Sequence, residues 1–142
     1  MAVEIQVAYQ GQLRCEASHG PSGATFPTDA PVDNHGKGAS FSPTDLVGTA
    51  LAACMMTVMG IFAERKGIPL EGSTIKVEKH MIADPQRRIA RLPVTITIPH
   101  DIEEKHRKAL ERTALTCPVH QSLDPRIEIP IEFRWGAPAA SS

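Results

Sequence analysis

The stretch SPTDLVGTALAACMMTVMGIFAERKG, residues 42–67, predicts the longest helix of the chain. Ser42 is placed to cap its start, Pro43 suits the first helical position, and Asp45 completes an S-x-x-D capping pattern. Basic residues in the last turn complement the helix dipole, and Gly67 is a typical residue to end a helix. These local signals predict a helix that begins at Pro43 and ends before Gly67.

The interior of this helix carries no charge from Leu46 to Ala63. The uncharged run is shorter than the roughly 20 residues that a membrane span needs, and it is rich in alanine and glycine rather than in leucine and isoleucine. We therefore predict a buried core or interface helix and no membrane partner. A stripe of residues at four-residue spacing would let another helix approach closely: Gly48, Ala52, Met56 and Gly60.

The remaining elements are read from alternation, turn residues and caps. We predict a hairpin over 3–17, followed by a loop-rich segment over 18–41 with a short strand near 24–26. Two strands are predicted over 73–83 and 88–98, and a second helix, capped by Asp101, over 101–115. A last strand is predicted over 126–135, in which Pro130 marks an edge or a bulge. This order predicts a single α+β domain over 1–142 with a mainly antiparallel sheet and a frayed tail at 136–142.

Composition narrows the class of function. The 142 residues are 42% hydrophobic and 4% aromatic with a net charge of −1, which argues against nucleic acid and anionic membranes as partners. The start MAVEIQVAYQ has no secretory pattern, so we expect a cytoplasmic protein. In that compartment paired cysteines are more often catalytic, redox-active or metal-binding than structural.

Two of the three cysteines are candidates for chemistry. Cys54 lies in the middle of the long helix, and taken alone it is best interpreted as a small residue packed in the core. A reactive Cys54 thiol would require a cation from a flanking segment, such as Arg14 or Lys37. Cys117, in TCPVHQSL (116–123), is predicted to cap a short helix that Pro118 begins. The positive end of that helix would lower its pKa and favour the thiolate. The alternative reading of this stretch is a cysteine that only packs at the start of a helix.

A metal site is the competing use of these residues. Cys117 and His120 have a ligand-like spacing, but a closed zinc site needs about four ligands and half of them are unaccounted for. We therefore predict no metal and no cofactor. Cys15, on a predicted strand, is most simply a small core residue.

Two stretches together resemble the OsmC/Ohr family of thiol-dependent peroxidases. GKGASFSPTDLVGTALAACMMTVM (36–59) is similar to its glycine-bearing loop and cysteine-carrying small-residue helix, and TCPVHQSL is similar to its second cysteine in a C-P context. The resemblance covers nearly the whole chain and is closest to the OsmC-like branch.

The resemblance implies a fold, a partner and a mechanism. The fold is a curved, mainly antiparallel sheet on a long central helix and a second helix, in an intertwined, obligate homodimer. The peroxidatic residue would be Cys54, which reduces organic hydroperoxides, or hydrogen peroxide, and becomes a sulfenic acid. Cys117 would resolve it to a disulfide, which requires Cα atoms within about 7 Å, and an external dithiol such as a dihydrolipoyl group would reduce it.

The sequence departs from the family pattern at the groups that activate the first cysteine. The family has an arginine near that cysteine, held by a glutamate at the helix start. In this chain Thr44 occupies the position of the family glutamate, and Asp45 is the nearest acid. Arg14 is the only arginine in the N-terminal strands, and Gln12 matches the position of the family arginine nearly as well. Arg14 and Asp45 are therefore candidate site residues, and a non-catalytic dimer that binds an apolar ligand at its interface is the alternative function.

Overall fold

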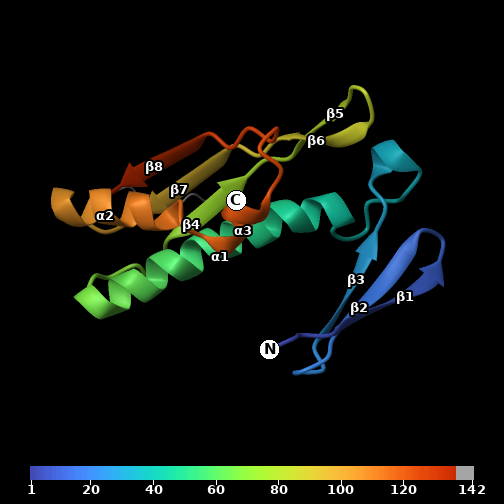
Figure 1. Cartoon of the computed structure of the whole chain (residues 1–142), viewed down its shortest axis with the longest axis horizontal. Coiled ribbons are helices and arrows are strands. Elements are labelled where there is room, and N and C mark those ends of the chain that lie inside the picture. The colour runs from blue at the N-terminus through green and yellow to red at the C-terminus, as the bar shows by residue number, and fades with distance from the viewer. Residues whose placement is uncertain (137–142) are drawn as a thin grey trace. The chain divides into compact units, whose positions relative to one another are not determined.

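The first of two structural units, Met1–Val47, contains an antiparallel sheet (Figure 1). Its strands are β1 (Ile5–Gly11), β2 (Arg14–His19) and β3 (Thr25–Asp29), in the order β1-β2-β3. The predicted hairpin is confirmed. The predicted short strand is longer than expected, because β3 pairs with β2 along its whole length, from Ser18 opposite Thr25 to Arg14 opposite Asp29.

The segment between β3 and the long helix is held against β3 by hydrogen bonds. A short 3-10 turn spans Val32–Asn34, the Asp29 backbone N–H donates to the Phe41 carbonyl at 3.1 Å, and the Ser40 hydroxyl donates to the Pro27 carbonyl at 2.9 Å. The loop therefore leads from β3 to the start of the next helix along a defined path.

Helix α1 (Pro43–Lys66) has the predicted bounds. The Ser42 hydroxyl accepts the Asp45 backbone N–H at 3.0 Å, and the Asp45 carboxylate accepts the Ser42 backbone N–H at 2.9 Å, which is a reciprocal capping box. Gly67 follows with φ +67°, the left-handed conformation that ends many helices. By length and composition alone α1 could cross a membrane, a test that core helices of soluble proteins also pass.

The structure is a computed structural model and describes the chain up to Gly136. Within these residues, the second unit, from Gly48 onward, contains two small sheets. One sheet consists of β4 (Thr74–Val77), β7 (Val94–Ile98) and β8 (Ile131–Trp135), in the order β4-β7-β8. Strand β8 lies at the edge of this sheet, as Pro130 predicts, and runs parallel to β7. Strands β5 (His80–Ala83) and β6 (Arg87–Arg91) form a separate hairpin. Of the predicted tail 136–142, all but Gly136 lies outside the described residues.

The three long strands predicted in this unit are shorter than expected. The segment 73–83 is divided between β4 and β5, and 88–98 between β6 and β7, where Pro93 lacks the N–H that a continuous ladder would use. In 126–135 the strand begins only after Pro130; Glu128 makes an isolated bridge with Arg91. Alternation in the sequence reports the buried face and does not detect these interruptions.

The second helix also begins later than predicted. Helix α2 spans Glu104–Ala114, with Glu103 rather than Asp101 at its N-cap. The Asp101 carboxylate instead pairs with Arg107 at 3.2 Å, while the Arg107 Nε donates to the Ile102 carbonyl. These contacts hold residues 101–102 outside the helix.

The core of this unit lies between α1 and the sheet. Leu51, Met55 and Met59 are fully buried on one side of α1, and Ile96 and Ile98 of β7 are fully buried in the sheet. In the predicted stripe of small residues, a Cβ built on Gly48 would meet Val77 and Leu92 at ordinary contact distance. No atom of the described residues lies within 4 Å of a Cβ built on Gly60.

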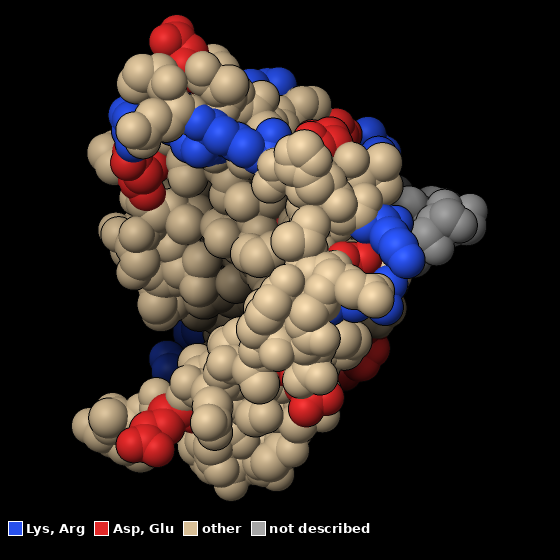
Figure 2. All heavy atoms as spheres, turned by 90° about the vertical axis from the view of Figure 1, so that its right-hand side faces the viewer, with Lys and Arg blue, Asp and Glu red and all other residues tan. Residues whose placement is uncertain are grey.

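Charged side chains of both signs are scattered over the face shown in Figure 2, between wide uncharged areas. Elsewhere in this structure the same mixing of signs gives ion pairs, such as Arg91 with Glu128 and Arg126 with Asp124. This face therefore does not form a broad field of one sign.

Candidate active site

Cys117 caps the short helix α3 (Pro118–Ser122), as the sequence predicts. Its sulfur accepts the His120 backbone N–H at 3.3 Å, and the side chain is completely buried. Pro118 at the first helical position has no N–H to leave unsatisfied. The local sequence therefore fixes where the Cys117 thiol points relative to α3.

Cys54 and Cys117 lie side by side in the second unit. The Cys54 side chain hydrogen-bonds to the Cys117 thiol, and both cysteines are free thiols. Cys54 is partly buried on α1, next to the fully buried Met55, whereas Cys117 is fully buried at the start of α3. Two thiols in hydrogen-bond contact are a candidate pair for reversible disulfide formation.

The pKa of the Cys117 thiol is raised above its ordinary value, which contradicts the prediction of a lowered one. Burial is the largest cause, and the hydrogen bond with the neighbouring Cys54 adds to it. The backbone N–H groups of His120 and Val119 act in the opposite direction but are outweighed. Cys117 is therefore a protonated thiol at neutral pH.

Arg14 and Asp45 belong to the first unit. Arg14 pairs with Asp29, with 3.8 Å between Nε and Oδ2, and Asp29 is only 1% exposed. Asp45 serves the capping box with Ser42, and the Thr44 hydroxyl lies 3.2 Å from that of Ser42. Sequence reasoning did not consider Asp29, because only the strand register places it opposite Arg14.

The residues proposed for a metal do not form a cluster. Within the described part of the chain there is no group of three or more His, Cys, Asp or Glu side chains that could hold a metal ion. His120 contacts Cys117 through its backbone N–H.

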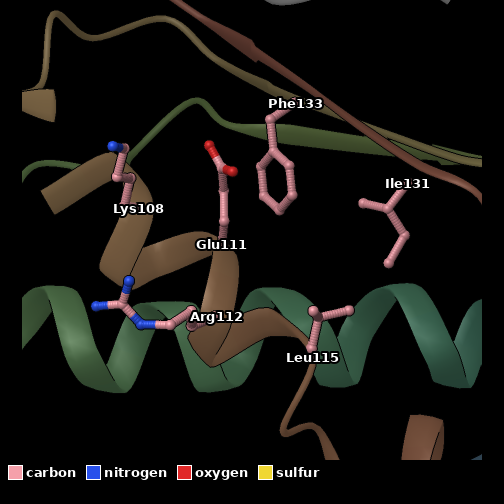
Figure 3. A pocket seen from close by; sticks show the side chains of 6 residues that line it. All are labelled: Lys108, Glu111, Arg112, Leu115, Ile131 and Phe133. Atoms are coloured by element: carbon pink, nitrogen blue, oxygen red, sulfur yellow. The ribbon is translucent and has the colours of Figure 1, made fainter. Parts of the chain in front are cut away.

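A separate cavity of about 400 Å³ opens between α2 and β8 (Figure 3). Ile131 and Phe133 from β8 form an apolar wall, and Leu115 lies at the end of α2. Charged side chains of α2 complete the lining: Lys108, Glu111 and Arg112. Neither cysteine of the pair lines this cavity.

Comparison with known proteins assigns the family. The family described as OsmC-like protein matches residues 35–132. A crystal structure of a proposed osmotic stress induced and detoxification response protein from Psychrobacter arcticus 273-4 is 46% identical, with 91% of this chain and 93% of that chain covered and a TM-score of 0.87. The chain belongs to the OsmC-like protein family.

More distant OsmC-like structures share the fold. An organic hydroperoxide resistance protein OsmC from Legionella pneumophila is 16% identical over 94% of this chain and 97% of that chain, with a TM-score of 0.76. The organic hydroperoxide resistance protein OhrB of Bacillus subtilis is 14% identical over 94% and 98%, with a TM-score of 0.70. Comparison with curated proteins finds no match. The predicted α+β, OsmC-like fold is thereby confirmed.

Proposed function

We propose that this OsmC-like protein is a two-cysteine thiol peroxidase that reduces organic hydroperoxides. The observation that carries the proposal is the hydrogen bond between the thiols of Cys54 and Cys117. The names of the Legionella and Bacillus proteins, which share the fold, suggest the substrate class.

The raised pKa of Cys117 supports different roles for the two thiols in this proposal. Because burial keeps Cys117 protonated, Cys54 is the residue available to act as the thiolate nucleophile. The Cys54 thiolate attacks the terminal peroxide oxygen and the O–O bond breaks. The alkoxide leaves and takes up a proton to become the alcohol, and Cys54 is oxidised to a sulfenic acid.

The second step uses the neighbouring thiol. The Cys117 sulfur attacks the Cys54 sulfur, its proton and the sulfenic hydroxyl leave together as water, and a disulfide joins the two residues. An external dithiol then reduces this disulfide and becomes a disulfide itself. A cytoplasmic location would supply such reductants.

The family resemblance implies a cation for the Cys54 thiolate, and Arg14 is the candidate that the sequence offers. It is the arginine of the N-terminal strands, and an adjacent positive charge lowers a thiol pKa and so increases the thiolate fraction. Asp45, in the first turn of the helix that carries Cys54, is the second proposed residue of this site; its described contact is with Ser42.

A homodimer is the proposed assembly. Ile5, Val7 and Tyr9 alternate along β1, so they share one face, and each is 59–67% exposed. An apolar sheet face of this kind is unusual on the surface of a monomer and is typical of an interface. A second copy of the chain is the occupant that the family resemblance implies.

Peroxide turnover tests the function. We expect the protein to consume cumene hydroperoxide in the presence of dihydrolipoamide, Cys54→Ser to abolish turnover, and Cys15→Ser to retain it. Equal rates for wild type and Cys54→Ser would exclude the proposed peroxidase. A thiol no more reactive with peroxide than free cysteine would favour the non-catalytic binding protein.

A further inference from the structure

We propose that the cavity between α2 and β8 is a binding site for a monocarboxylate that carries a short aliphatic chain. All the residues that line this cavity belong to the second unit, and neither cysteine of the proposed pair is among them. The proposal therefore goes beyond the peroxidase proposal and does not depend on it. The cavity volume of about 400 Å³ falls within the roughly 300–1,000 Å³ of small-molecule sites.

The lining of the cavity divides into a charged end and an apolar end. Figure 3 shows the end groups of Lys108 and Arg112 on one side of the view. The side chains of Phe133, Ile131 and Leu115 lie on the other side. Small-molecule sites commonly combine an apolar lining with a few polar groups that fix the orientation of the ligand. This division matches a ligand with a charged head group and an apolar chain.

The charges of the lining favour a ligand with one negative charge. Lys108 and Arg112 supply two positive charges and Glu111 supplies one negative charge, so one positive charge is in excess. A monoanion neutralises this excess, whereas a dianion such as a phosphate monoester would be repelled more strongly by Glu111. A carboxylate also matches the planar fork of a guanidinium, which can donate two parallel hydrogen bonds to it.

Arg112 is the cation whose donors are available to a ligand. Among the residues up to Gly136, its side chain has no hydrogen-bond or ion-pair partner. Lys108 pairs with Glu104 at 3.8 Å, but the two side chains are 67% and 81% exposed, and ion pairs at such exposed positions contribute little to stability. Both cations can therefore bind an anion in the cavity without the loss of a strong contact.

Contacts among neighbouring side chains hold the apolar wall in place. The rings of Phe133 and Trp135 stack, with 5.8 Å between their centroids and 7° between their planes. The Arg107 guanidinium lies over the Trp135 ring, and the Trp135 indole N–H donates to Glu111 Oε2 at 3.2 Å. Because this wall is already ordered, a ligand that binds to it causes little further loss of conformational entropy.

Leu115 provides apolar surface that a ligand can cover. Its side chain is 45% exposed, although the preceding Ala114 is fully buried. A single exposed leucine is ordinary on a protein surface. Here it lines the same cavity as an aromatic wall and an arginine with available donors, and this combination indicates an amphipathic ligand. An aliphatic chain against Leu115 and Ile131 would remove apolar surface from water.

Trp135 is a built-in reporter for the site. It is the only tryptophan of the chain, and it contacts Glu111 and Phe133, both of which line the cavity. We expect octanoate to change the Trp135 fluorescence of the full-length protein in a saturable way. 1-Octanol has the same chain length without the charge, so its Kd should be about tenfold higher or more. Isothermal titration calorimetry gives the same constants without relying on fluorescence.

Three variants separate the contributions of the head group and of the chain. Arg112→Gln should raise the Kd of octanoate about tenfold or more and leave that of 1-octanol unchanged. Leu115→Gln should weaken the binding of both probes. Lys105→Gln removes one positive charge from the same helix at a residue that does not line the cavity, so this matched control should bind octanoate as wild type does.

A check of folding accompanies these titrations. Arg112 lies in the last turn of α2, where a cation also complements the helix dipole, so circular dichroism is used to verify that Arg112→Gln is folded. Leu115→Gln tests the apolar end independently of that charge.

Several results would overturn the proposal. One is that neither fluorescence nor calorimetry detects saturable binding of octanoate, and another is that 1-octanol binds equally well. The proposal also fails if Arg112→Gln or Leu115→Gln binds octanoate as wild type does, or if Lys105→Gln loses as much affinity as Arg112→Gln. Tighter binding of octyl phosphate than of octanoate would exclude a site built for a monocarboxylate.

Discussion

The thiols of Cys54 and Cys117 share a hydrogen bond, although one lies in the middle of α1 and the other caps α3. Their surroundings differ. The Cys117 side chain is completely buried and its sulfur accepts a backbone N–H, whereas Cys54 is partly exposed. This asymmetry between two adjacent thiols underlies the order of steps in the proposed reaction.

Alkylation should distinguish the two thiols by pH. Because burial and the Cys54 contact raise the pKa of Cys117, we expect its reaction with iodoacetamide to have a midpoint above the roughly 8.5 of a free cysteine. Residue-resolved mass spectrometry measures this midpoint, and the urea-unfolded protein is the control. A Cys117 midpoint at or below that of the unfolded protein would contradict the prediction.

The same shift predicts a loss of stability at alkaline pH. The folded pKa lies above the unfolded one, so as pH rises above about 8.5 the unfolded state loses its proton first and is favoured. We expect the free energy of unfolding to fall over this range in wild type and to fall less steeply in Cys117→Ser. Urea titrations at a series of pH values measure both slopes, and identical slopes would argue against a raised pKa.

One equivalent of cumene hydroperoxide should oxidise two of the three thiols in wild type and join Cys54 to Cys117. In Cys117→Ser no partner thiol is present, so the Cys54 sulfenic acid should accumulate and react with dimedone. Thiol titration and peptide mass spectrometry measure both products. Cys15→Ser is the matched control and should form the same disulfide; a disulfide that includes Cys15 in wild type would be inconsistent with the proposed pair.

Removing the Asp45 side chain should destabilise α1. Asp45→Ala loses the hydrogen bond to the Ser42 N–H and should lower the free energy of unfolding by about 1 kcal/mol. Asp45→Asn keeps an acceptor oxygen and should lose less. Urea denaturation measures both variants, and a lower peroxidase rate in Asp45→Asn at unchanged stability would show that the charge serves the site as well as the helix.

Placing a charge on the apolar face of β1 should disrupt the proposed dimer. Val7→Asp would bury a carboxylate at the interface, so the mass in solution should fall from twice 15.4 kDa toward that of one chain. Gln6→Asp, on the opposite face of the same strand, is the matched control. Light scattering after gel filtration measures the mass; a wild-type monomer would exclude the dimer.

The sequence alone determined the elements whose signals are local. The bounds of α1 follow from the capping box at Ser42 and from Gly67, and the position of Cys117 at the start of α3 follows from the proline after it. A cap or a turn depends on neighbours within a few residues, so the chain carries this information without its fold.

The tertiary structure decided what depends on residues far apart in the chain. It interrupted strands that alternation predicts as continuous, and it reversed the predicted pKa shift of Cys117, because burial beside Cys54 outweighs the backbone N–H groups of α3. It also paired Arg14 with Asp29 through the register of β2 and β3. Burial and register arise only when distant segments pack together, and here they raise the pKa of Cys117 and give Arg14 its partner.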